Sequence, residues 1–344
     1  MFNGIKSKVR EFIFFTLYLL GIGLIIRMFH MNRQRIPILL FHRVTDLYDP
    51  YTEPLDLNQF ESILKFLKNK YHIRPLDDLY TCDINDLLQS CFIVFDDALI
   101  DFYENAWPIL EKSKIPVTLF VPTEPVNSKK VYWSLELFSS FILSNEDYIE
   151  LSVNNKIINY NLIGNKKIQS VKNIHKLLLT TSIDERNELL DKIKNNINLS
   201  TVNSNFQMMN WDNLKTLVHK GLDVQSHTKS HEYLPMLDDD MIDDEFSLSK
   251  AEIKNQLNTL PSAVSYPYGA FNDNVIRCAG KHYKYGYITN NELLNLNQLD
   301  DYQNGRLLLS RINVTDKFPF ELYFRINGFH SMIKSLFNKI IKAR

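Results

Sequence analysis

Apolar runs that end in polar side chains recur along this chain, and they predict buried strands. The clearest is residues 91–95 (CFIVF), which lead directly into Asp96 and Asp97. A continuous apolar run of this length is typical of a strand that is buried on both faces. A second run, residues 37–41, ends at His42. Both strands therefore deliver a polar side chain at their C-terminal ends.

Strands and amphipathic helices alternate over most of the remaining chain. The helical period predicts helices at residues 57–71, 101–112, 184–195, 211–220 and 241–257, with a kink or a late start caused by Pro108. Further strands are predicted at 117–121, 222–226, 263–266, 285–289 and 307–312, and a short strand or connector at 71–75. Strand, helix and strand joined by short links indicate a parallel sheet with right-handed crossovers.

Residues 129–206 interrupt this alternation. The segment is rich in Asn, Lys and Ile, and its only clear helical pattern is at 184–195. We interpret it as an insertion between two strands of the main domain. It is either additional scaffold or a cover on the substrate side of a site, and the pattern does not separate these two interpretations.

The N-terminal residues 12–26 contain no charged residue, and basic residues stand on both sides. As a helix the segment is roughly 22 Å long, short of the roughly 30 Å hydrocarbon core, so Arg27 has to snorkel if the span extends further. We expect an uncleaved membrane anchor at 1–30. A cleaved signal peptide and an interfacial or buried helix are the alternatives. Because basic residues flank the segment on both sides, the positive-inside rule does not define its orientation in the membrane.

The C-terminal residues 329–344 have an apolar face surrounded by lysine and arginine. This pattern is typical of a helix on an anionic membrane surface, although packing against the domain fits it too. We therefore predict an anchor at 1–30, a main domain at 31–320 with the insertion at about 129–206, and a basic helix at 321–344. The expected location is membrane-associated, in a bacterial inner membrane, on a side that the sequence does not define.

Composition excludes several other functions. A formal net charge of −1 gives no indication of a general nucleic-acid partner. Cys82, Cys91 and Cys278 are scattered without CxxC spacing, so neither a disulfide framework nor a thiolate metal site is indicated. No glycine lies between Gly23 and Gly164, so no phosphate-binding glycine loop is available there.

Two histidines indicate metal chemistry. His227 and His231 are four residues apart and follow the predicted strand at 222–226. Two imidazoles and one carboxylate form a ligand set that leaves positions open for water and substrate. In a parallel barrel the C-terminal strand ends share one face, so this pair can meet Asp96 and Asp97. Adjacent side chains on an extended segment point opposite ways, so one carboxylate can bind a metal while the other remains a base.

These motifs resemble those of the polysaccharide deacetylase family, whose members share the NodB homology domain. Residues 95–97 (FDD) resemble its TFDDG motif, residues 226–231 (SHTKSH) its H(S/T)xxH motif, and residues 266–269 (YPYG) its RxPYG motif. The resemblance spans about residues 37–316. It implies an α/β fold, a distorted (β/α) barrel of about seven strands, and a metal-dependent hydrolase that removes acetyl groups from sugars.

The resemblance also implies roles for individual residues. Asp97, His227 and His231 would hold a divalent metal ion, most often Zn²⁺ in this family. Asp96 would be the general base that accepts a proton from the metal-activated water. The backbone N–H of Tyr268 would stabilise the oxyanion, with packing beside the turn as the alternative.

The general acid is less evident. In many family members it is a histidine in a late strand motif, and no histidine closely follows the strand at 307–312. His42, at the end of an early strand, resembles the corresponding residue in a permuted branch of the family. We therefore expect His42 to be the acid, with a structural role as the alternative.

Two positions depart from the family motifs. Ala98 replaces the usual glycine, which restricts the turn. The arginine of RxPYG is absent, because the uncharged Val264 and Ser265 stand before the tyrosine. Arg311 is a candidate for the positive charge near Asp96, and a surface arginine is the other interpretation.

The predicted function is removal of N-acetyl groups from an envelope polysaccharide or a lipid-linked saccharide. The predicted partners are the acetylated glycan and a membrane, without nucleic acid. An O-acetyl esterase acting on carbohydrate is an alternative, since the same site can attack an ester. A catalytically silent glycan-binding protein is the third interpretation.

Overall fold

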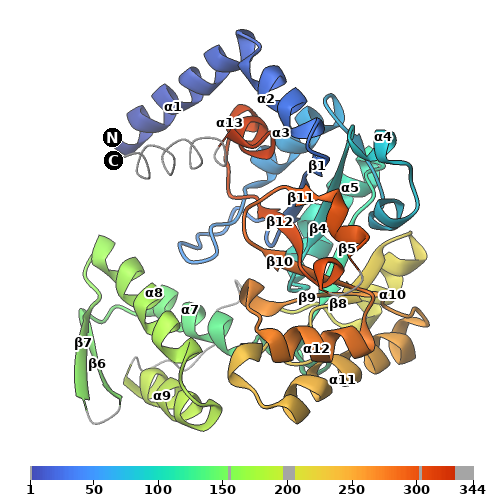
Figure 1. Cartoon of the computed structure of the whole chain (residues 1–344). Coiled ribbons are helices and arrows are strands. Elements are labelled where there is room, and N and C mark those ends of the chain that lie inside the picture. Colours follow the sequence, from blue (N-terminus) through green and yellow to red (C-terminus); the bar gives the residue numbers. More distant parts are fainter. Residues whose placement is uncertain (1, 154–155, 197–205, 302–303, 330–344) are drawn as a thin grey trace, which may run out of the picture.

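Seven parallel strands form a closed barrel at the centre of the computed structural model, which describes residues 2–153, 156–196, 206–301 and 304–329 (Figure 1). The strands are β2 (Ile38–Phe41), β4 (Ser90–Phe95), β5 (Thr118–Val121), β8 (Asp223–Ser226), β9 (Ala263–Ser265), β10 (Tyr285–Thr289) and β12 (Leu309–Asn313). Their order is β2-β12-β10-β9-β8-β5-β4, and pairing of β2 with β4 closes the ring. The predicted barrel of about seven strands is confirmed.

The strands are continuously apolar because both of their faces are buried. In β4, Phe92 and Val94 belong to the core inside the barrel, whereas Ile93 and Phe95 belong to the core under the surrounding helices. β3 (His72–Ile73) adds to the first residues of β4, and β1 (Arg35–Ile36) pairs separately with β11 (Leu294–Asn295). The strand predicted from residue 307 begins at Leu309, because Gly305–Leu307 forms a 3₁₀ turn.

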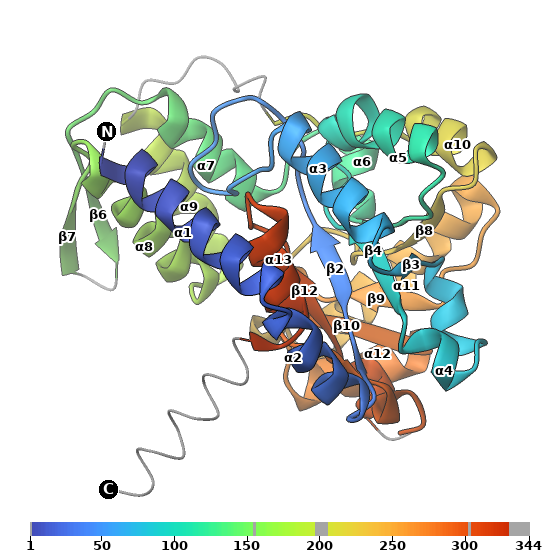
Figure 2. The same ribbon diagram turned by 90° about the horizontal axis from the view of Figure 1, so that it is seen from above.

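Helices surround the barrel in both views (Figures 1 and 2). They are α3 (Leu57–Lys68), α4 (Ile84–Leu87), α5 (Trp107–Ser113), α6 (Thr123–Ser128), α10 (Trp211–His219), α11 (Asp239–Leu257), α12 (Asp273–His282) and α13 (Pro319–Ile326). A capping box of Asp56 and Gln59 begins α3. The π-helical residues Phe102–Ala106 run directly into α5, so the chain is helical from before Pro108 and the late start considered at this proline is not observed.

The insertion forms a small subdomain between β5 and β8. It comprises α7 (Trp133–Leu143), the antiparallel hairpin β6 (Tyr148–Val153) and β7 (Lys156–Asn161), α8 (Asn165–Leu179) and α9 (Ile183–Asn196). Its helices and hairpin bury a hydrophobic core of their own. Tyr132, Ser134 and His175 line the same cavity as His42 and Asp96, so the insertion stands at the C-terminal end of the barrel strands.

The N-terminal segment consists of two helices, α1 (Phe2–Leu19) and α2 (Ile22–Met31), separated at Gly21, which has φ 72°. No single helix in the described part of the chain is long and apolar enough to cross a membrane. Val9–Leu19 and Ile22–Met28 meet that criterion only together, as a pair bent by 66°. The expectation of one continuous helix over residues 12–26 is therefore wrong. The C-terminal helix expected at 329–344 lies, beyond Phe329, outside the described residues.

Candidate active site

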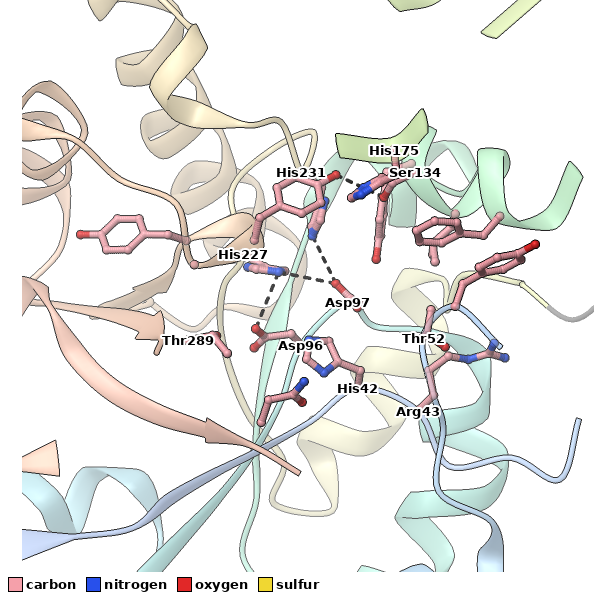
Figure 3. Close-up of a pocket in the computed structure, with 18 of the residues that line it drawn as sticks. His42, Arg43, Thr52, Asp96, Asp97, Ser134, His175, His227, His231 and Thr289 are labelled. Atoms are coloured by element: carbon pink, nitrogen blue, oxygen red, sulfur yellow. Dashed lines mark hydrogen bonds and ion pairs between the residues drawn. The ribbon is translucent and has the colours of Figure 1, made fainter. Parts of the chain in front are cut away.

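The C-terminal strand ends meet in a cavity of about 500 Å³ (Figure 3). β2, β4 and β8 each deliver at least one of the predicted residues to its wall. The barrel residues that line it include His42, Asp96, Asp97, His227, His231, Tyr268, Thr289 and Asn313. The structure thus brings together the three motifs, which are spread over residues 95–269 of the sequence.

Asp97, His227 and His231 form the group of side chains able to hold a metal ion in the described part of the chain. The Nε2 atoms of His227 and His231 lie 3.5 and 3.3 Å from Oδ1 of Asp97. One potential ligand atom from each residue lies within 4.8 Å of the others, and all three residues are buried. Figure 3 shows the three side chains pointing toward one another.

The chemistry of this group fits a divalent cation. Tetrahedral coordination with bonds of about 2.1 Å separates neighbouring ligand atoms by roughly 3.4 Å, which is close to the separations found here. Nδ1 of His227 donates to the carbonyl oxygen of Ser265 at 2.8 Å. That bond places the ring proton on Nδ1 and leaves the Nε2 lone pair directed toward Asp97.

The loops that carry these groups have strained backbones. Asp97, Ala98, Thr228, His231 and Tyr268 have φ values of 79°, 56°, 66°, 63° and 59°. A non-glycine residue in this left-handed region costs about 1–2 kcal/mol. Ala98 therefore keeps the turn for which the family motif uses glycine, at the cost that its Cβ imposes. Such strain concentrates at functional sites, where the surrounding structure enforces it.

The segment between His227 and His231 is an irregular turn, and a buried carboxylate fixes it. Glu245 of α11 accepts hydrogen bonds from the backbone N–H groups of Lys229 and Ser230 at 3.0 and 2.9 Å. It also accepts the Ser230 hydroxyl. The two imidazoles therefore converge without helical geometry.

Asp96 lies in a polar network at the mouth of the barrel. Arg311 is fully buried and donates to both carboxylate oxygens of Asp96, at 2.8 and 2.9 Å. The hydroxyl of Ser265 donates to Asp96 at 2.9 Å, and Arg311 donates to that hydroxyl at 2.6 Å. Asp96, Ser265 and Arg311 each stand two positions after an inward-facing apolar residue of β4, β9 and β12, respectively. Because side chains alternate between the two faces of a strand, all three point into the barrel.

This network accounts for the departure from RxPYG. Ser265 occupies the place of the motif arginine, and Arg311 brings its charge to Asp96 from β12. Of the two interpretations of Arg311, the surface arginine is excluded. Burial alone would raise the pKa of Asp96, but the charge and hydrogen bonds of Arg311, together with the nearby His227 and His42, outweigh it and lower that pKa below its usual value.

His42 extends from the end of β2, which lies between β4 and β12 in the barrel. It is half-buried and stands beside Asp96 in Figure 3. Its positive charge, when present, contributes to lowering the pKa of both Asp96 and Asp97. The late strand β12 ends instead at Asn313, which also lines the cavity.

The insertion supplies the opposite wall, which sequence analysis did not resolve into residues. The lining residues from this segment are Tyr132, Ser134, Leu135, Phe138, Lys172 and His175. Tyr132 stacks on the ring of His231 with a centroid distance of 3.8 Å. The hydroxyl of Tyr268 donates to Ser134 at 3.2 Å. The aromatic pair Tyr132-Trp133 was the signal available in the sequence.

A buried ion pair attaches the insertion to the metal-binding loop. Arg186 of α9 donates to both oxygens of Glu232, the residue after His231, at 2.5 and 2.7 Å. The Arg186 guanidinium also lies over the ring of Trp133 at 4.8 Å.

Burial and the nearby His231 lower the pKa of His175 to about 4, so this side chain is neutral at physiological pH.

Arg43 is a further buried charge that sequence analysis missed. It follows His42 and donates to Asp49 at 2.8 Å and to Asp101 at 2.7 Å. Burial raises the pKa of Asp101 to about 6 despite this partner. The basic residue beside His42 was visible in the sequence, but its two acidic partners are not adjacent to it and could not be inferred.

Comparisons with known proteins agree with this architecture. The sequence model of the family described as "Polysaccharide deacetylase" matches residues 180–287, which include His227, His231 and Tyr268. No curated protein matches the chain. Among solved structures, the Streptococcus pyogenes deacetylase PplD in complex with acetate has a TM-score of 0.57 and 20% identity, covering 85% of this chain and 98% of that one.

Two further solved structures show the same fold. A polysaccharide deacetylase from Bacillus cereus has a TM-score of 0.54 and 16% identity, covering 84% of this chain and 69% of that one. IcaB from Ammonifex degensii has a TM-score of 0.50 and 15% identity, covering 86% and 96%. At these identities the likeness concerns the fold.

The fold is a (β/α) barrel like that of the compared deacetylases, and its site contains a group of side chains able to hold a metal ion. The family match over residues 180–287 and the deacetylases among the solved structures bear out the predicted resemblance to the polysaccharide deacetylase family and the predicted enzyme class, a saccharide deacetylase.

Proposed function

We propose that this protein is a metal-dependent hydrolase that removes N-acetyl groups from a saccharide of the cell envelope, either a polysaccharide or a lipid-linked precursor. The observation that supports the proposal is that two adjacent carboxylates have different partners. Asp97 faces two imidazoles, as a metal ligand would, whereas Asp96 is separately paired with Arg311. A hydrolase of this kind needs both a ligand and an unligated base.

The proposed roles follow from this arrangement. Asp97, His227 and His231 hold the ion, for which we propose Zn²⁺. When bound, the ion supplies a Lewis acid that acidifies a water molecule and polarises the acetyl carbonyl. Asp96 accepts the proton of the attacking water, and Arg311 keeps Asp96 ionised and oriented for that transfer.

Two further groups complete the reaction. The backbone N–H of Tyr268 donates a hydrogen bond to the carbonyl oxygen as negative charge develops on it. His42 donates a proton to the sugar nitrogen when the C–N bond breaks, so that acetate and a free amine leave. Its place on the wall next to Asp96 supports this assignment (Figure 3). Membrane association and the envelope substrate are parts of the same proposal and are supported by the apolar N-terminal helices.

The test is Asp96→Asn in the full chain. We expect the variant to retain its metal, because Asp96 is not a ligand, and to lose about 10²–10⁴-fold in rate, which is typical of removing a general base. Bound metal would be measured together with acetate and primary amine released from acetylated glycans and lipid-linked sugars. Asp212→Asn, an exposed carboxylate on α10, is the control.

The products separate the alternatives. Acetate with an equal amount of new amine supports the N-deacetylase. Acetate without amine indicates an O-acetyl esterase. Metal-loaded protein that binds the glycan but releases no acetate indicates the silent glycan-binding protein. Full activity of Asp96→Asn would remove Asp96 from the proposed mechanism.

A further inference from the structure

The outer face of α1 and α2 is an exposed apolar surface. Eight large apolar side chains within residues 9–28 are more than half exposed, against six in all the rest of the described chain. They are Val9, Phe12, Ile13, Leu19, Leu20, Leu24, Ile25 and Met28. A contiguous apolar surface of this size marks an interaction site.

The inner face of the same helix pair is attached to the barrel. Phe14 packs on Phe324 of α13 at 5.6 Å, and Tyr18 contacts Tyr323 of α13 at 5.4 Å. Tyr18 also contacts Phe66 of α3 at 6.0 Å. The helices therefore lie against the domain, and Figures 1 and 2 show α1 running beside α13.

A close approach and an ion pair strengthen this attachment. Gly23 is buried, and a Cβ there would lie only 3.0 Å or less from ring atoms of Tyr323. Arg10 pairs with Glu321 at the start of α13. The geometry of the helix pair relative to the barrel is therefore fixed by specific contacts on its inner face.

Neither helix can cross a bilayer alone. The apolar part of α1, Val9–Leu19, is about 16 Å long and Ile22–Met28 is about 10 Å, against a hydrocarbon core of roughly 30 Å. Because the two helices are bent by 66° at Gly21, they do not form one straight span. A helix pair with one face on a protein domain and an apolar outer face suits the plane of a membrane interface.

The charge of the segment favours an anionic bilayer as the occupant. Residues 1–36 contain six basic residues and a single acidic one, Glu11, although the whole chain has a net charge of −1. Basic residues beside a shallow apolar surface are attracted to anionic lipid headgroups. A symmetric dimer through this face would instead bring the same basic segments together, which is unfavourable.

We propose that α1 and α2 dock the protein on an anionic membrane, with both helices in the plane of the interface and their outer face in the acyl boundary. Docking through this surface requires no helix that crosses the membrane. The proposal rests on the membrane association that is part of the proposed function and specifies how the protein attaches; it does not depend on the proposed reaction.

The first experiment is flotation of the full chain with vesicles of phosphatidylglycerol and phosphatidylcholine. The triple variant L20Q/L24Q/I25Q should lose at least about tenfold in vesicle binding, since three exposed apolar side chains leave the acyl boundary. The control triple variant I157Q/I163Q/L260Q changes equally exposed apolar residues elsewhere and should bind normally. Deacetylation of a soluble substrate should be unchanged in both, which separates docking from catalysis.

The second experiment distinguishes in-plane docking from a span. Phe12→Cys and Leu24→Cys, in a Cys82→Ser background, would be labelled with a fluorophore and quenched by lipids brominated at known depths; Cys91 and Cys278 are buried. In-plane docking predicts the same shallow depth at both positions. A continuous spanning helix predicts depths that differ by about 18 Å.

Three results would overturn the proposal. The first is unequal depths of that size. The second is the absence of vesicle binding by the natural sequence. The third is a concentration-dependent dimer, without vesicle binding, that the L20Q/L24Q/I25Q variant abolishes, because a second copy would then be the occupant.

Discussion

The two walls of the cavity are built in different ways. The barrel wall is charged, and Asp96 is held there by hydrogen bonds from Arg311 and Ser265. The insertion wall is mainly aromatic and is held by stacking, as with Tyr132 on His231 and His175 on Trp133. One wall tolerates almost no change in geometry, whereas the other presents apolar rings of the kind that contact sugars.

This difference indicates how the two walls share the work. The charged wall carries the proposed chemistry, for which atoms must be held to fractions of an ångström. We propose that the aromatic wall covers the site, supports His231 and contacts the substrate. Of the two interpretations of the insertion, the substrate-side cover is therefore the one that we propose. Four predictions test the division, from the largest expected effect to the smallest.

His231→Ala should abolish metal binding and reduce activity by at least about 10³-fold, because a three-residue ligand set loses one member. Metal content and acetate release would be measured together. Tyr132→Phe keeps the ring that stacks on His231, and it should retain the metal. If Tyr132→Phe lost as much metal as His231→Ala, the metal site would depend on both walls, and the separate roles described for them would be contradicted.

Arg311→Met should destabilise the fold by about 3–5 kcal/mol, because Asp96 would remain buried without its cation. Removing Arg311 should also raise the pKa of Asp96, since that charge now lowers it, and should move the acidic limb of kcat/KM to higher pH. Thermal unfolding and pH–rate profiles would measure both effects. The double variant R311M/D96N should recover most of the lost stability; if it does not, the ion pair is not the cause.

Phe138→Ala tests the aromatic wall, where the ring stacks on Tyr51 at 5.1 Å. If this wall contacts the sugar, KM should rise by about three- to tenfold with kcat nearly unchanged, the size expected for one aromatic contact. Steady-state kinetics on an acetylated oligosaccharide would show it. Phe138→Leu, which keeps apolar volume, controls for packing, and a fall in kcat alone would contradict the assignment.

His175 gives the smallest expected effect, on stability against pH. Its pKa is lowered from 6.5 to about 4, so the folded state binds fewer protons than the unfolded state between these values. Stability should therefore fall as the pH decreases from about 6.5 toward 4, and His175→Leu should reduce that part of the decrease. Urea unfolding at several pH values would measure it, and identical pH profiles for both proteins would exclude His175 as the source.

The barrel and its charged wall were predictable because their signals are local. A buried strand is apolar along its whole length, so residues 91–95 predicted β4 and placed the two following carboxylates at its end. Parallel strands place their C-terminal ends together, which was enough to expect the two motifs in one cavity. The resemblance then assigned roles that spacing alone left open.

The insertion and the N-terminal bend were not predictable in the same way. α7 is apolar around most of its circumference, so it gave no clear helical face. α8 does have an apolar face, at Val171, Ile174 and Leu178, and that signal was missed. The break lies at Gly21, which has φ 72°, and the close approach to α13 is made by Gly23 against Tyr323, three hundred residues away in sequence. The sequence did not determine which residue pairs with Asp96, because only folding brings Arg311 of β12 to that carboxylate.

The position of β2 sets the order in which the site can be completed. Leu39 pairs with Ile93 of β4 on one side and with Ile312 of β12 on the other. Pairings so far apart in sequence carry a high closure entropy and form late. While the chain is being synthesised, the ring must therefore remain open until β12 has left the ribosome, and Asp96 gains Arg311 only with that last strand. Assembly of the reactive carboxylate is thus coupled to arrival of the final barrel strand, and a nascent chain truncated before it has no completed site.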